Sequence, residues 1–90
     1  MIAKTEDIRR WFQNGVEIGS THLIVVNDTF NWSDYPVQVS EDEDVEEVAK
    51  KYHYRMNMQK VMEVYDLSVD MEMQIKEHRA FHGVNSLLFR

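Results

Sequence analysis

Residues 21–39 read THLIVVNDTFNWSDYPVQV and contain the clearest strand patterns of the chain. It opens with a continuous run of apolar, mostly branched side chains, Leu23–Val26, bounded by polar residues. Such a run is typical of a strand that is buried on both faces. We therefore predict a central strand over about residues 22–27.

The end of the same stretch predicts a second strand. Tyr35, Val37 and Val39 alternate with Pro36 and Gln38, which is a period of two. Because proline has no amide proton to donate to a ladder, this strand belongs at the edge of a sheet or starts there. The two strands, at about 22–27 and 35–40, are joined by about seven or eight polar and aromatic residues, which predicts a β-hairpin with a long loop.

An amphipathic helix precedes the hairpin. Thr5 is the expected N-cap, two acids follow in the first turn, and the apolar residues then recur at helical spacing. This apolar face consists of Ile8, Trp11 and Phe12, with Val16 as a further member. Asn14-Gly15 is the predicted stop and Gly19 a second one, so the helix is placed at about residues 5–14.

A crossing helix follows the hairpin, at about residues 41–53. Ser40 stands three residues before Glu43, which is a capping-box pattern. An apolar face at helical spacing comes next, formed by Val45, Val48, Ala49 and Tyr52.

The pattern from Met58 to Ile75 fits both a helix and a strand. We favour a third strand at about 60–67, then a turn and a C-terminal segment over Asp70–Arg79 that is left open between strand and helix. The apolar tail Leu87–Phe89 is expected to dock on the sheet or on a neighbouring subunit. Together these elements predict one α+β domain.

Composition narrows the class of protein. Ninety residues make a single small domain with a thin core, so homo-oligomerisation is open. The absence of cysteine excludes disulfides, thiolate zinc sites and cysteine nucleophiles, and it favours a cytoplasmic protein. The sequence shows no signal peptide and no apolar run of roughly 20 residues, so we expect a protein that does not span the membrane. A net charge of −6 disfavours direct nucleic-acid binding, which usually needs a basic patch.

Two stretches are candidate contact surfaces. The hairpin loop combines aromatic rings with acids and amides, and its candidate residues are Asp28, Phe30, Trp32, Asp34 and Tyr35. Either its aromatics cover one end of the core, or they form a recognition surface. The acidic start of the crossing helix, with Glu41, Asp42, Glu43 and Asp44, is either a solvated helix terminus or a surface for a basic partner.

Catalysis, metals and cofactors are not indicated. His78 and His82 stand four apart but lack a zinc-protease frame, and Gly83 follows directly. The pairs Met56/Met58 and Met71/Met73 are better explained as adaptable apolar contacts than as copper ligands. There is no glycine-rich phosphate loop and no nucleophile elbow.

Three strings carry a resemblance to a known group of proteins. They are THLIVVNDTF at 21–30, DYPVQV at 34–39 and NMQKVMEVYDL at 57–67. The chain resembles small uncharacterised proteins of bacteriophages and prophages over about residues 5–82. That resemblance implies an accessory factor that acts on host machinery, including inhibition of host antiviral defence, and it carries no catalytic residue with it.

Three functional hypotheses result. The first is a non-enzymatic phage or prophage protein that binds a host protein through the two candidate surfaces. The second is an oligomeric protein that sequesters a nucleotide, with the loop aromatics stacking the base and His53, Arg55 or Arg79 meeting the phosphates. The third is a structural or assembly protein without a ligand.

Overall fold

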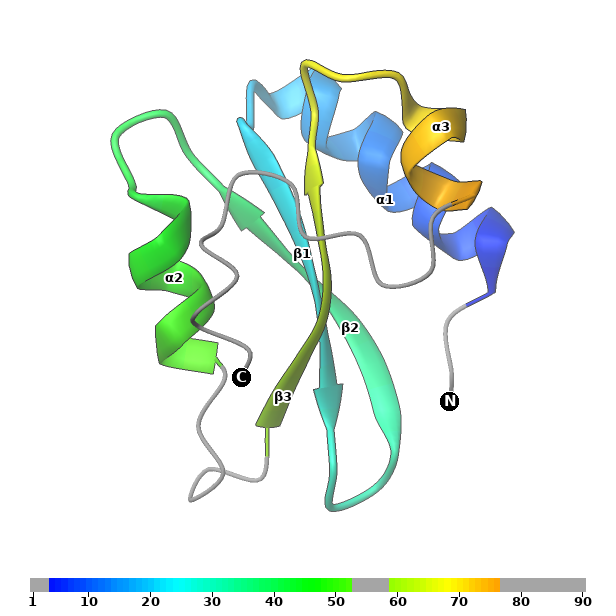
Figure 1. Ribbon diagram of the computed structural model, residues 1–90, viewed down its shortest axis with the longest axis vertical. Helices are drawn as coiled ribbons and strands as arrows, with labels where there is room; N and C mark the ends of the chain where they lie inside the picture. The colour runs from blue at the N-terminus through cyan, green and yellow to red at the C-terminus, as the bar shows by residue number, and fades with distance from the viewer. Residues whose placement is uncertain (1–3, 53–58, 77–90) are drawn as a thin grey trace.

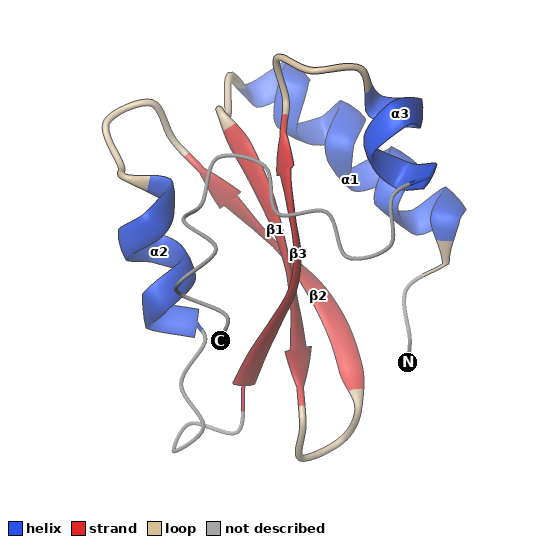
Figure 2. Cartoon of the chain, viewed as in Figure 1, coloured by secondary structure: helices blue, strands red, loops and turns tan. Residues whose placement is uncertain are grey.

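Three antiparallel strands form one sheet in the order β2–β1–β3, with helices on both of its faces (Figures 1 and 2). The computed structural model describes residues 4–52 and 59–76. The elements follow in the order α1 (Thr5–Ile18), β1 (His22–Asp28), β2 (Ser33–Val39), α2 (Val45–Tyr52), β3 (Gln59–Asp66) and α3 (Met71–Lys76). The predicted α+β class is confirmed.

The central position of β1 is confirmed by its burial. Every residue from Leu23 to Val26 is at most 2% exposed, because the strand has a neighbour on each side and a helix over each face. β2 lies at an edge of the sheet, and its Pro36 stands opposite Val25. Pro36, which has no amide proton to donate, thus lies in a strand that has a partner on one side only.

The alternation along β1 divides the core into two clusters. On one face Leu23 and Val25 pack with Tyr65 and with the apolar stripe of α1, formed by Ile8, Trp11 and Phe12. On the other face Ile24 and Val26 pack with Ala49 of α2 and with valines of the outer strands, Val39, Val61 and Val64. In Figure 1, α1 and α3 lie together on one side of the sheet and α2 lies on the other.

A β-bulge shifts the register between β1 and β3. Val25 stands opposite Glu63 whereas Val26 stands opposite Val61, so Met62 is the extra residue. Cross-strand neighbours share a face, so Glu63 lies on the Val25 face of the sheet. Met62 packs against the core cluster of that same face.

α1 is one turn longer than predicted. It ends at Ile18 and is capped by Gly19 in the left-handed conformation (φ 81°), which was the second of the two expected stops. Gly15 lies inside the helix instead, because β2 approaches closely there: a Cβ at Gly15 would lie 2.5 Å from the side-chain oxygen of Gln38. The N-cap is Lys4 and not Thr5, and the Lys4 N–H donates to Asp7.

α2 begins at Val45, later than the predicted start at about residue 41. The Ser40 N–H donates to Glu43 Oε1 as a capping box requires, yet this pair closes a turn ahead of the helix. Asp44 performs the capping, because its Oδ1 accepts the Glu46 N–H at 2.9 Å. The helix is followed to Tyr52, the last residue before the gap in the described part.

The third strand is confirmed at Gln59–Asp66, and the open segment after it contains a helix, α3. The Asp70 side chain accepts the Met73 N–H at the start of this helix. Gln74 is fully buried, and its amide bonds the Asp66 N–H and the Asp66 and Val69 carbonyls, which ties α3 to the end of β3. Met71 and Ile75 are four residues apart and pack together on the core.

Several predictions concern residues outside the described ranges. These are the docking of the tail Leu87–Phe89, the histidines His78 and His82, and the phosphate contacts of His53, Arg55 and Arg79. In the described ranges, no helix has both the length and the apolar character that crossing a membrane requires.

Candidate functional site

The β1–β2 connection is a tight turn and not the long loop that was predicted. Asp28 pairs with Ser33, so only the four residues Thr29–Trp32 lie outside the ladder. The predicted loop was too long because Asp28, Ser33 and Asp34 are residue types that favour turns, although here they extend the two strands. The connection is therefore a short turn in place of a long loop.

Polar side chains of the turn hold its backbone. Asp28 Oδ1 accepts the Phe30 N–H at 2.9 Å, and Asn31 Oδ1 accepts the Ser33 N–H at 3.2 Å. Trp32 adopts the left-handed conformation with φ 57°, which is uncommon for a residue with a large side chain but recurs in short hairpin turns. The conformation of the tip is therefore fixed by bonds that do not involve its aromatic rings.

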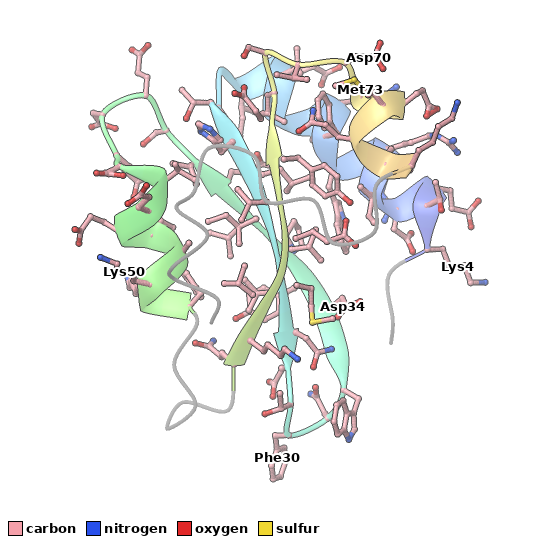
Figure 3. The ribbon with its side chains drawn as sticks, in the orientation of Figure 1. Lys4, Phe30, Asp34, Lys50, Asp70 and Met73 are labelled. Carbon is pink, nitrogen blue, oxygen red and sulfur yellow. The ribbon has the colours of Figure 1, made fainter. Side chains whose placement is uncertain are left out.

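The aromatic residues of this stretch separate. Phe30 is 75% exposed and Trp32 is 66% exposed, and Figure 3 shows Phe30 projecting from the far end of the hairpin. Tyr35 is half-buried, packs on the α2-side cluster and accepts a hydrogen bond from Gln59 at 2.6 Å. The interpretation that these aromatics cover one end of the core applies to Tyr35 alone.

Asp34 lies on the α1 side of the sheet near this tip. The side chain of Asn27, its partner on β1, is buried and donates to Asp34 Oδ1 at 2.7 Å. Glu63, on the same face, is half-buried, and burial together with the negative charge of Asp34 raises its pKa to about 7. This face of the sheet therefore holds two interacting carboxylates.

A hollow of about 200 Å³ lies near the tip, with Asn27 and Asp34 but not Glu63 in its lining. Trp32 and Met62 supply its large apolar side chains, and polar side chains supply the rest of its lining: Asn27, Thr29, Asp34 and Lys60. Sequence reasoning singled out Trp32 and Asp34 but missed Asn27, Lys60, Met62 and Glu63. The strand alternation hinted at their faces, but the bulge at Met62 sets the register, and no sequence signal located that bulge.

The acidic residues Glu41, Asp42, Glu43 and Asp44 lie elsewhere. All four are exposed, in the turn that follows β2 and at the start of α2. Bonds from the Ser40 N–H and hydroxyl lower the pKa of Glu43. The hairpin tip precedes β2 and this turn follows it, so the seven-residue strand separates the two predicted surfaces by about 20 Å.

A second polar group occupies the opposite end of the sheet from the tip. His22 Nδ1 lies 3.0 Å from Thr21 Oγ1, and His22 Nε2 lies 3.9 Å from Asp66 Oδ2, beside a hollow of about 410 Å³. The second distance is too long for a hydrogen bond. Burial lowers the pKa of His22. The hydroxyl–histidine–carboxylate order does not form a relay, because a relay requires the carboxylate to hydrogen-bond the histidine and Asp66 lies too far away for that.

Among the residues that the structure describes, no group of three or more histidine, cysteine, aspartate or glutamate side chains is placed to hold a metal ion. Comparison of the chain with protein-family models, with curated proteins and with solved structures finds no match in any of the three.

Proposed function

We propose that the chain is a non-enzymatic protein-binding module that contacts its partner through the tip of the β1–β2 hairpin. One observation carries this proposal: Phe30 and Trp32, two large aromatic side chains two residues apart, are both exposed on a turn whose backbone is held by Asp28 and Asn31. Exposing such side chains is unfavourable for an isolated chain, and a partner that buries them recovers that free energy.

Aromatic anchors suit protein interfaces for a physical reason. They bury a large area at the cost of few rotatable bonds, and they dominate measured interface energies. A turn whose backbone is already held by hydrogen bonds needs less ordering on binding than a long loop would. The tip therefore meets both requirements of a binding hot spot.

Charge favours a basic partner. The chain carries a net charge of −6, and Asp28 and Asp34 flank the tip. Acids near the tip disfavour insertion of its aromatics into an anionic membrane and disfavour contact with nucleic-acid phosphates. The exposed acids at 41–44 are a second contact surface only for a partner that spans the length of β2.

The cellular setting of the proposal rests on the resemblance to phage and prophage proteins. In that setting the partner is a host protein, the site of action is the host cytoplasm, and the outcome is inhibition of host antiviral defence. The tip and the acidic charge are compatible with that role, which needs a binding surface and no catalytic group.

Nucleotide sequestration is the weaker alternative. It requires the loop aromatics to form one stacking platform, whereas Tyr35 packs on the α2 side and Trp32 borders the hollow on the α1 side. A thermal-shift screen against nucleotides tests it, because a ligand at 100 times its dissociation constant adds about 2.7 kcal/mol. Light scattering of the pure protein tests the homo-oligomeric assembly.

The main experiment is capture of partners from a bacterial lysate with tagged wild-type protein and two double variants. Phe30→Ala/Trp32→Ala removes the anchors at the tip. Val16→Ala/Ile18→Ala is the matched control, because these two side chains are also exposed, at 55% and 69%, but lie at the end of α1. We expect the tip variant to lose the captured protein and the control to retain it; retention by both variants contradicts the proposal.

A further inference from the structure

The hairpin tip lies away from the two helices on the α1 side of the sheet. α1 and α3 pack over the half of the sheet that carries Leu23, Val25 and Tyr65. Figure 1 shows both helices beside one end of the sheet, and the turn between β1 and β2 at the other end. The tip therefore projects beyond the half of the sheet that these helices cover.

The two exposed rings of the tip differ in their contacts with the rest of the chain. Phe30 is 75% exposed, and among the described residues it belongs to neither core cluster and not to the lining of the hollow near the tip. Trp32 is 66% exposed, borders that hollow together with Met62, and has an interaction of its own within the chain. The two aromatic side chains are therefore not equivalent as binding groups.

The turn positions Phe30 through its backbone and not through its ring. The Phe30 N–H donates to Asp28 Oδ1 at 2.9 Å, and two residues further on the Ser33 N–H donates to Asn31 Oδ1 at 3.2 Å. Figure 3 shows the ring of Phe30 at the far end of the hairpin. A partner is thus able to cover this ring without breaking either of the bonds that hold the turn.

The chemistry of the benzyl group restricts the kind of surface that binds it. It has no hydrogen-bonding atom, so the free energy of binding grows with the apolar area that the partner removes from water. A flat surface covers one face of a projecting ring, whereas a concave apolar site covers both faces and the edge. Anchoring aromatic residues of protein interfaces accordingly occupy well-packed pockets that exclude water.

We propose that Phe30 alone is the anchor of the tip and inserts its ring into an enclosed apolar pocket of the partner protein, while Trp32 stays against its own chain beside the hollow. This inference rests on the proposed function, because it divides the roles within the proposed contact surface and assigns the chemistry of the partner's site. Phe30 is then the residue that determines which proteins the tip selects.

Other environments for the ring fit less well. A lipid bilayer also takes up aromatic side chains, but Asp28 lies at the base of the turn and the chain carries a net charge of −6, which opposes approach to an anionic membrane. A nucleobase stacks on one face of the ring only, and its phosphates meet the same negative charge.

The first test uses the purified protein and β-cyclodextrin, a ring of sugars whose apolar cavity admits one phenyl group. Maltoheptaose, the open chain of the same sugars, is the matched control probe. In ¹⁵N-labelled protein, we expect millimolar β-cyclodextrin to shift the backbone amides of Phe30 and Asn31 and to leave the indole N–H signals of Trp32 and Trp11 in place. Maltoheptaose should shift none of them, and Phe30→Ala should abolish the response to β-cyclodextrin.

The second test separates the two rings in the capture of partners from a bacterial lysate. Phe30→Ala should reduce the amount of captured protein by at least about tenfold, whereas Trp32→Ala should reduce it by less than about threefold. Phe30→Leu retains an apolar side chain and should recover part of the capture. Ile18→Ala is the control, because Ile18 is also exposed but lies at the end of α1. β-Cyclodextrin should release the captured protein and maltoheptaose should not.

Three outcomes overturn the inference. They are a shift of the Trp32 indole in place of the Phe30 amide, an equal or larger loss of capture in Trp32→Ala, and binding to phosphatidylcholine vesicles that Phe30→Ala abolishes. The first two leave the proposed function standing if Phe30→Ala/Trp32→Ala loses its partner, because the tip is then still the contact surface. If the double variant keeps its partner, the proposed function itself fails. Far-ultraviolet circular dichroism verifies that each variant is folded.

Discussion

The two tryptophans of this chain differ sharply in burial. Trp11 lies on the apolar stripe of α1 and is 9% exposed, whereas Trp32 lies in the hairpin turn and is 66% exposed. The residue type is the same, so the difference comes from what stands opposite each ring. Trp11 points from α1 onto the half of the sheet that this helix covers. Trp32 lies at the end of the other half, at the hairpin tip.

The largest expected effect comes from truncating the two rings separately. Trp11→Ala should lower the free energy of unfolding by about 3–5 kcal/mol, because it opens a cavity in the cluster around Leu23 and Tyr65. Trp32→Ala should change it by less than about 0.5 kcal/mol. Urea denaturation followed by circular dichroism measures both, and equal losses would show that the tip also supports the core.

The next largest effect on the free energy of unfolding comes from comparing a buried and an exposed residue of α3. Gln74→Ala should cost about 2–3 kcal/mol, because it leaves the Asp66 N–H and the Asp66 carbonyl without the amide that bonds them. Met73→Ala is the control, since the Met73 side chain is half exposed and neighbours Gln74 in the same helix. A similar loss in both variants would mean that the amide network is not what fixes α3.

A smaller effect tests the close approach of α1 to the edge strand. Gly15→Ala should cost about 1–2 kcal/mol, because the added Cβ would lie 2.5 Å from Gln38 Oε1 and 2.7 Å from Leu67 Cδ1. The same change in a Gln38→Ala background should cost less, since half of the conflict is gone. Additive losses in this double-mutant cycle would rule out the contact as the cause.

The smallest effect concerns pH and the half of the sheet near the tip. The pKa of Glu63 is raised in the folded state from 4.5 to about 7, so the folded chain binds more protons than the unfolded chain between these values. Stability should therefore fall as pH rises from about 5 to about 7.5, by about 1 kcal/mol after allowance for partial solvation.

Glu63→Gln isolates this contribution. The variant should be more stable than the wild type at pH 8 and equal to it at pH 5, and the difference is read from urea midpoints at both values. Burial also lowers the pKa of His22, but this residue is present in both proteins and its contribution cancels in the comparison. A pH-independent difference would show that Glu63 is ionised throughout.

The sequence was most informative where one periodicity held over a whole element. The branched run at Leu23–Val26 and the proline-marked alternation after it placed the central and the edge strand correctly. The stripe of Ile8, Trp11 and Phe12 located the helix that covers β1, and the strand prediction at about 60–67 matched β3.

Predictions from single residues were less successful. Asn14-Gly15 resembles a helix stop, but Gly15 is required by the approach of Gln38, which is distant in sequence. Only half of the predicted Ser40–Glu43 capping box forms, and it lies outside the helix: Glu43 accepts the Ser40 N–H, but the Glu43 N–H bonds the Ser40 carbonyl and Asp44 takes the capping position. Local signals name the interactions that a residue is able to make, and the surrounding structure selects among them.

The α+β class, the central strand and the acidic, aromatic character of the hairpin follow directly from residue patterns in the sequence. Three features depend on the folded arrangement: Phe30 and Trp32 are exposed, Tyr35 packs on the core, and Glu63 lies near Asp34 on one face. The physical reason is that burial depends on register and on which helix covers which half of a sheet. Both are set by contacts between residues far apart in the chain, here by a bulge at Met62 and by two helices that cover one end of the sheet.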